Sequence, residues 1–117
     1  MIHFKIFFND YKWTIEVFIE PKEQDAGVIE SRLKQIGCSD KCIDRALDTV
    51  LHEHNSGFVY TKMEHRYSVM AMDCGTSMDE FINTYHHEKN HIEMHIAEYY
   101  NIDPMSEEAS KMSGDLA

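Results

Sequence analysis

The segment Met78–Tyr100 reads MDEFINTYHHEKNHIEMHIAEYY and runs without glycine or proline. Ser77 or Thr76 stands before it, and Glu80 follows three or four residues later, a spacing that resembles the capping box at the start of a helix. Pro104 cannot continue a helix and marks its far end. The sequence therefore predicts one long helix from about Met78 to Tyr100.

The rest of the chain shows two strand pairs and three further helices. Apolar residues alternate in residues 2–8 and 12–19, which predicts a β-hairpin, and the β-rich runs within residues 58–72 predict a second one. Apolar residues at helical spacing predict helices over residues 24–36, from Asp40 to about residue 54, and from Ser106 to about residue 116. We expect one α+β domain over residues 1–117, with four strands in a small antiparallel or mixed sheet and about four helices.

Length and charge exclude several classes of protein. The chain has 117 residues, of which 43% are hydrophobic and 27% charged, as in an ordinary soluble domain. Its formal net charge of -10, without a basic stripe, argues against binding to nucleic-acid phosphates. No window is long and apolar enough for a membrane span, and the N-terminus does not resemble a signal peptide. We expect a cytoplasmic protein that binds neither nucleic acid nor membrane, and the sequence carries no signature of its oligomeric state.

The three cysteines predict reduced thiols, since an odd number without an export signal fits a cytoplasmic protein. Cys38 and Cys42 could place two thiolates one helical turn apart, as in zinc-ribbon or redox proteins. No second Cys/His pair lies near them in sequence, and Cys74 stands alone. We therefore interpret all three as structural thiols.

The long helix contains a pattern typical of a metal site. His87 and His91 are four residues apart, so both imidazoles leave the same face of the helix one turn apart and can reach one Zn²⁺. Glu88 is rotated about a third of a turn from His87, which places it beside the metal, where it could accept a proton from a coordinated water. His87-Glu88-Lys89-Asn90-His91 thus follows the H-E-x-x-H logic of two ligands and a base on one turn.

A site of this kind needs a third protein ligand. Glu108 shares the apolar face of the last predicted helix and is expected to point toward the long helix, whereas Glu107 is better placed for a surface pair with Lys111. We predict Glu108 as the third ligand, with Glu107 as the alternative. His95, one turn beyond His91, could be a ligand in a site that lacks Glu108, or a partner of a ligand.

The other histidines are predicted to lie outside the site. His86 is expected to be exposed or to pack against a neighbour. His52 and His54 stand at the end of the second predicted helix, where a polar or positive side chain suits the helix dipole.

Four stretches carry a resemblance to a known family: GFVYT at residues 57–61, RYSVMAM at 66–72, DEFINTYHHE at 79–88 and IDPMSEEA at 102–109, with Gly114 after them. They resemble small zincins carried by bacteriophages and mobile elements of bacteria. More distantly, an H-E-x-x-H followed by a Glu-Ala helix is similar to minimal gluzincins of the ImmA/IrrE kind. The resemblance implies a zincin-like metallopeptidase fold in which His87, His91 and Glu108 bind Zn²⁺ and Glu88 is the general base.

The chain departs from this family pattern between the two ligands. Lys89 and Asn90 stand where the family usually has small or apolar, uncharged residues, which predicts that this side of the helix is exposed. We also expect no counterpart, after the last predicted helix, of the extra lobe that forms the substrate cleft of larger zincins.

Two functions of different classes follow from these observations. The first is a zinc-dependent metallopeptidase that hydrolyses a peptide or protein substrate, held by strand addition if the predicted strand over residues 67–72 lies at a sheet edge. The second is a catalytically inactive zincin-like module that binds a metal or a protein partner. Glu88 is present in both, so the sequence does not separate them.

Overall fold

The two predicted hairpins join into one four-stranded mixed sheet. The computed structural model describes residues 1–75, 77–103 and 106–116. Strand β1 (Ile2–Phe8) pairs antiparallel with β2 (Trp13–Ile19), and β3 (Gly57–Lys62) pairs antiparallel with β4 (Tyr67–Met72). Strands β2 and β4 then pair in parallel, so the strand order is β1-β2-β4-β3.

The four predicted helices are also confirmed, with bounds that differ by a few residues. They are α1 (Ala26–Gln35), α2 (Asp40–His52), α3 (Met78–Tyr100) and α4 (Glu107–Leu116), and short 3-10 turns span Asn9–Tyr11, Glu23–Asp25 and Met63–His65. The Ser77 side chain accepts a hydrogen bond from the Glu80 amide at 3.2 Å and so caps α3. The alternative cap at Thr76 and the predicted break at Pro104 lie outside the described residues.

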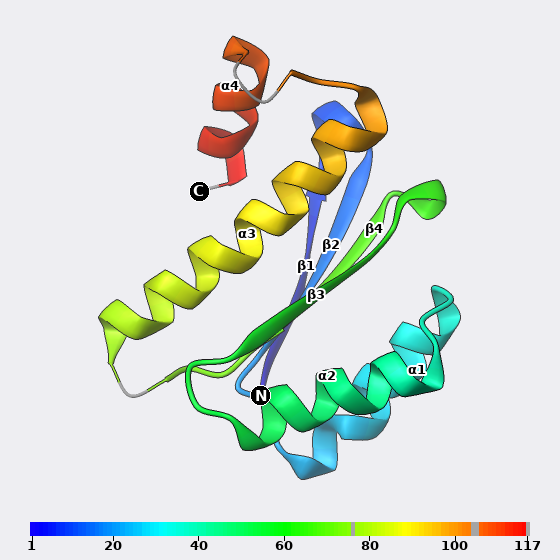
Figure 1. Ribbon diagram of the computed structural model, residues 1–117, viewed down its shortest axis with the longest axis vertical. Helices are drawn as coiled ribbons and strands as arrows, with labels where there is room; N and C mark the ends of the chain where they lie inside the picture. Colours follow the sequence, from blue (N-terminus) through cyan, green and yellow to red (C-terminus); the bar gives the residue numbers. More distant parts are fainter. Residues whose placement is uncertain (76, 104–105, 117) are drawn as a thin grey trace.

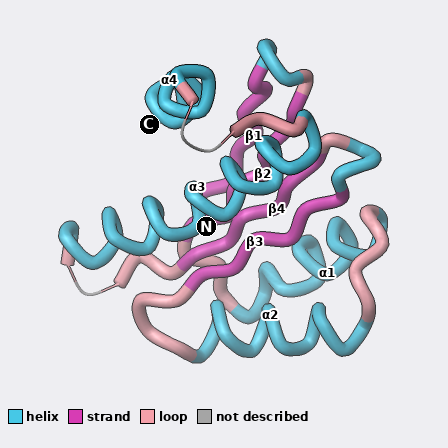
Figure 2. The backbone as a smooth tube through the Cα atoms, turned by 45° about the horizontal axis from the view of Figure 1, so that its top comes forward, coloured by secondary structure: helices cyan, strands magenta, loops and turns pink. Residues whose placement is uncertain are grey.

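Helices cover both faces of the sheet, and the strands supply a hydrophobic core to each. Figures 1 and 2 show α1 and α2 on one side of the sheet and α3 on the other. Because neighbouring residues of a strand point to opposite faces, Val17 and Met70 pack with α3 and α4, whereas Phe18 and Val69 pack with α1 and α2. The site-bearing helix α3 thereby rests on an apolar layer that fixes its position over β3 and β4.

Strand β4 lies inside the sheet, so the condition for strand addition at residues 67–72, a position at the sheet edge, is not met. It is flanked by β2 and β3, and five of its six residues are buried. The cause is the parallel pairing of the two hairpins through their second strands, which gives β4 a partner on both edges, while helices cover both of its faces. The uninterrupted apolar run Val69–Met72 is typical of such a strand. Among the described strands, the edges of the sheet are β1 and β3.

A buried carboxylate ties four elements together on the face covered by α1. Glu16 of β2 is fully buried, and its carboxylate lies 2.7 Å from Arg32 Nε of α1 and 2.6 Å from His3 Nε2 of β1. The hydroxyl of Tyr67, on β4, donates to Glu16 at 2.7 Å. Burial, followed by this hydrogen bond, raises the pKa of Tyr67 to about 12. The charge is therefore satisfied only when β1, β2, β4 and α1 are all in place.

None of the helices, within the residues that the structure describes, has the length and apolar character to cross a membrane. Helix α3 is long enough, but charged side chains occur along its whole length.

Replacing Arg32 by methionine is expected to destabilise the fold by about 2 to 3 kcal/mol, because it leaves the buried Glu16 carboxylate without its cation. The estimate stays below that for a fully buried pair because the Arg32 side chain is 32% exposed. Urea unfolding of Arg32→Met and of the control Lys34→Met measures the difference. Lys34 forms a surface pair with Glu30 on the same helix, so its loss should change the free energy of unfolding by less than about 0.5 kcal/mol. Equal effects of the two changes would contradict the role of Glu16.

Candidate metal centre

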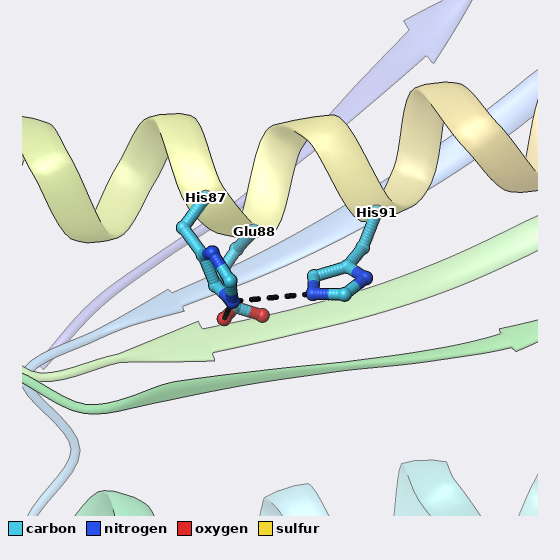
Figure 3. A group of neighbouring side chains, drawn as sticks. All are labelled: His87, Glu88 and His91. Carbon is cyan, nitrogen blue, oxygen red and sulfur yellow. Dashed lines mark hydrogen bonds and ion pairs between the residues drawn. The ribbon is translucent and has the colours of Figure 1, made fainter.

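Two histidines of α3 converge as the motif predicted. His87 and His91 leave the same side of the helix, toward β3 and β4, with Glu88 between them (Figure 3). The two Nε2 atoms are 3.2 Å apart, and both side chains are exposed. Glu88 Oε1 lies 3.8 Å from His87 Nε2. Within the described part of the chain, His87, Glu88 and His91 form the group whose potential ligand atoms all lie within 4.8 Å of one another.

The separation of the two imidazole nitrogens fits a shared tetrahedral metal ion. Two nitrogens bound to Zn²⁺ at about 2.0–2.1 Å with a tetrahedral angle stand about 3.3 Å apart. The observed 3.2 Å is close to this value. Both rings are accessible from solvent, so an ion could reach them without opening the fold. The two imidazoles could therefore hold a metal ion, and two nitrogen donors at this separation suit zinc.

Glu88 differs from the two histidines in its surroundings. The residue is only 5% exposed, and it is held against the start of β3. Burial raises the pKa of its carboxyl group, and the charges of His87 and His91 act in the opposite direction. A carboxylate in such surroundings is better suited to take up a proton than one in water.

Gly57 provides the space that Glu88 occupies. A Cβ atom added at Gly57 would lie 3.1 Å from Glu88 Cγ, 3.2 Å from the Ala71 carbonyl oxygen and 3.3 Å from Met72 Cβ. The first strand residue of β3 must therefore be small for Glu88 to sit against the sheet.

Glu108 is not brought to the two histidines. Its carboxylate accepts a hydrogen bond from the Tyr11 hydroxyl at 3.1 Å. The Tyr11 backbone oxygen in turn accepts from the hydroxyl of Tyr100, the last residue of α3. Tyr100 lies nine residues beyond His91, which is about 13 Å along the helix. Figures 1 and 2 show α4 on the side of α3 away from β3. Glu108, which was expected to point toward α3, is exposed, as is Glu107, and neither belongs to the group of possible metal ligands found among the described residues.

Lys89 is buried, which corrects the expectation that this position is exposed. It is 6% exposed, and its ammonium lies 3.2 Å from the Glu93 carboxylate and donates to the Ser113 carbonyl of α4 at 3.3 Å. The cause is α4, which covers this side of α3. Asn90 is exposed, as expected.

His95 is half-buried one turn beyond His91 and is fixed by a chain of hydrogen bonds. Its Nδ1 lies 2.8 Å from the Thr61 hydroxyl, which is 2.8 Å from the Ser68 hydroxyl, and Trp13 Nε1 donates to Ser68 at 2.9 Å. Burial, and then the charge of His91, lowers the pKa of His95. His95 is thus an oriented neighbour of the His pair, and His86 is exposed as predicted.

A cleft of about 550 Å³ opens beside His87 and Glu88 and includes residues that the sequence did not indicate. One wall is the first half of α3 with His87 and Glu88, and the other is the connection from α2 to β3 with Glu53 and His54. His54 therefore belongs to the surroundings of the site, whereas His52 pairs with Glu23 at 3.2 Å. No residue spacing in the sequence indicates that His54 lines this cleft, because the cleft forms where α3 crosses the start of β3.

The cysteines take no part in the candidate metal centre. Cys38 is buried, Cys42 is exposed and Cys74 is half-buried, all with free thiols. Burial, followed by the proximity of Cys42, raises the pKa of Cys38 to about 11. Among the described side chains, the group that could hold a metal contains no cysteine.

Compared with models of protein families, with curated proteins and with solved structures, the chain matches none of them. Any function must therefore be argued from the site itself.

Gly57→Ala is expected to destabilise the protein by about 1 to 3 kcal/mol, because the added methyl group presses on Glu88 and on the β4 backbone. Gly27→Ala is the matched control, since a Cβ there meets no atom within 4 Å and Gly27 lies in α1. That change should stabilise by about 0.4 to 1 kcal/mol. Thermal unfolding of both variants checks the signs, and a neutral Gly57→Ala would contradict the close contact.

His87→Ala and His91→Ala are each expected to weaken zinc binding more than about 100-fold, since each removes one nitrogen ligand. The control is His86→Ala, which removes an adjacent, exposed imidazole. Competition with a chromophoric chelator measures the affinities, and Glu108→Ala should behave like the control. Loss of zinc in Glu108→Ala but not in His91→Ala would overturn the assignment.

Proposed function

We propose that the protein is a zinc-dependent metallopeptidase with a zincin-like site on α3. The observation that carries the proposal is the pairing of His87 and His91 at a ligand separation, 3.2 Å between nitrogens, next to the buried carboxylate of Glu88. Two imidazole ligands and an adjacent carboxylate on one helical turn are the elements that zinc-assisted hydrolysis requires.

In this proposal His87 and His91 hold the ion and Glu88 moves the proton. Bound zinc would lower the pKa of a water toward about 7 and polarise the substrate carbonyl. Glu88 accepts the proton of the attacking water and delivers it to the leaving amine, a transfer favoured by its raised pKa. The chain of hydrogen bonds through Thr61 fixes the ring of His95 beside the pair.

Strand β3 is the element best placed to hold the substrate backbone. It is an edge of the sheet among the described strands, it contacts α3, and its first residue, Gly57, lies against Glu88. An extended peptide can add to such an edge by main-chain hydrogen bonds. This role replaces the one that the sequence suggested for residues 67–72.

Glu88→Gln tests the proposal, because glutamine keeps the shape of the side chain but cannot take up a proton. If wild-type protein loaded with zinc cleaves members of a mixed peptide library, the variant should lose about 100- to 10,000-fold in kcat. Its zinc affinity should stay within about tenfold of wild type, since His87 and His91 are unchanged. Mass spectrometry of the digests and metal analysis of the same samples give both values.

His86→Ala serves as the control and should cleave like wild type. Wild-type protein that binds zinc through His87 and His91 but cleaves no peptide would overturn the peptidase and favour a non-catalytic metal-binding module. Metal analysis that finds no zinc in the wild-type protein would overturn both.

A further inference from the structure

Strand β1 becomes more exposed toward its start. On the face that packs with α3, Phe8 at the end of the strand is 8% exposed, Phe4 is 41% exposed and Ile2 is 60% exposed. The cause is the oblique course of α3, which lies against Gly57 at the start of β3 and ends beside Tyr11, in the turn after β1 (Figure 1). The helix therefore covers the end of β1 and leaves its first half exposed.

The outer side of β1 is an edge without the usual protection. In the described part of the sheet β1 pairs with β2 alone, and the pairing runs through all seven residues without a bulge. The strand contains no proline, and Lys5 is its one lysine, arginine or carboxylate. Phe7, on the face opposite to Phe4, is 58% exposed. By contrast, all six residues of β3 are half-buried between α2 and α3. Of the two described edges, β1 is the one with exposed apolar side chains on both faces.

The backbone of β1 directs donors and acceptors outward. In β2, the amide of Thr14 donates to the carbonyl of Arg66, just before β4, at 2.9 Å. Alternate residues of a strand bond to opposite neighbours, so the odd-numbered residues of β2 bond to β1. The register pairs these with the even-numbered residues of β1. The amides and carbonyls of His3, Lys5 and Phe7 therefore point away from the sheet.

We propose that a second copy of the chain pairs antiparallel with the outer edge of β1, across a two-fold axis at Phe4, so that the two sheets become one. A two-fold axis perpendicular to the sheet places the α3 faces of both copies on the same side. The exposed half of β1 in one copy then lies beside that of the other, and each strand gains partners for its outward amides and carbonyls. The inference goes beyond the proposed function, because the candidate metal centre lies near β3, at the opposite edge of the sheet.

The side chains favour this register over its neighbours. Pairing centred on Phe4 sets Phe4 against Phe4 of the second copy and Ile2 against Ile6, which are apolar pairs on the exposed face. On the other face Lys5 lies against His3, which is held by a buried carboxylate. Centring on Lys5 would set two ammonium groups opposite each other, which destabilises a strand pair. Centring on Ile6 would leave the exposed Ile2 without an opposite residue in the strand.

The size and charge of the interface predict a weak dimer that salt strengthens. With two half-exposed phenylalanines and the strand backbone, pairing would bury about 500 Å² of each copy, near the lower limit of specific interfaces. We therefore expect a dissociation constant of about 10 to 100 µM. Each copy carries a formal net charge of -10, so two copies repel each other at low salt. Screening of this repulsion should tighten the dimer, whereas salt would weaken a contact made by ion pairs.

Sedimentation equilibrium of the full chain at about 5 to 500 µM, in about 0.05 and 0.5 M salt, measures the dissociation constant. Lys5→Pro removes an outward amide, which a monomer tolerates at a sheet edge, and should weaken the dimer more than about tenfold. Phe4→Asp sets two carboxylates against each other and should have the same effect. Met94→Asp is the matched control, since it changes an apolar residue of α3 that is 66% exposed. Circular dichroism confirms that each variant folds.

Phe4→Cys tests the register, in a background with Cys42→Ser and Cys74→Ser that removes the exposed and the half-buried thiol. The two-fold axis places the two introduced thiols side by side in a pair without mutual backbone hydrogen bonds, so mild oxidation with diamide should join the two chains. Phe7→Cys in the same background is the control. Phe7 lies three positions from the axis in each copy, so its two side chains are about 20 Å apart and should not be joined. Denaturing gel electrophoresis without reductant measures both.

A chain that stays monomeric at about 500 µM in both salt concentrations would overturn the inference. A dimer that Lys5→Pro and Phe4→Asp leave intact, or that Met94→Asp abolishes, would also overturn it, because another surface would then form the interface. Joining of Phe7→Cys but not of Phe4→Cys would overturn the axis at Phe4. None of these measurements depends on zinc or on peptide cleavage, so the inference and the proposed function can fail separately.

Discussion

The parallel pairing of β2 with β4 is the constraint on which the rest of the molecule depends. It joins two hairpins into one sheet, gives β4 a partner on both edges and leaves β3 as an edge among the described strands. The pairing is stabilised by apolar packing on both faces and by Glu16, whose carboxylate is satisfied only by groups from β1, β4 and α1. A different register of the two strands would leave that charge buried without partners, which is costly. The position of β3, and with it the place where α3 crosses the sheet edge, follows from this one arrangement.

The second constraint is the close approach of α3 to the start of β3. Gly57 allows it, because any side chain there would displace Glu88 or press on the β4 backbone. The approach gives the three residues of the motif different surroundings although they share one helical turn. His87 and His91 stay exposed, as ligands that must meet an ion require, while Glu88 is withdrawn from water and its pKa is raised. Helix geometry alone would place all three on the surface, so the division between ligands and base comes from the tertiary fold.

Local patterns in the sequence were sufficient to predict the helices and strands and the closeness of His87 and His91. Alternating and helical spacing predicted all four strands and all four helices, and the four-residue spacing predicted that His87 and His91 converge. What the local patterns left open or missed depended on how elements pack. Whether residues 67–72 lie at a sheet edge was left open, because nothing local specifies a parallel partner. Lys89 was expected to be exposed because it is charged, and the contact with α4 that buries it is not visible in the local sequence. Glu108 was expected to point toward α3, but its side chain is exposed and accepts a hydrogen bond from Tyr11, in the turn between β1 and β2.

Packing also explains why the cleft was missed. Glu53 and His54 stand in a connection, where neither helical nor strand periodicity applies, and they reach the site only because β3 begins beside Glu88. Their presence adds a carboxylate and an imidazole to the surroundings of His87, on a connection that no helix or strand pattern in the sequence describes. The His motif alone therefore marks one wall of the cleft, and the opposite wall is set by tertiary packing.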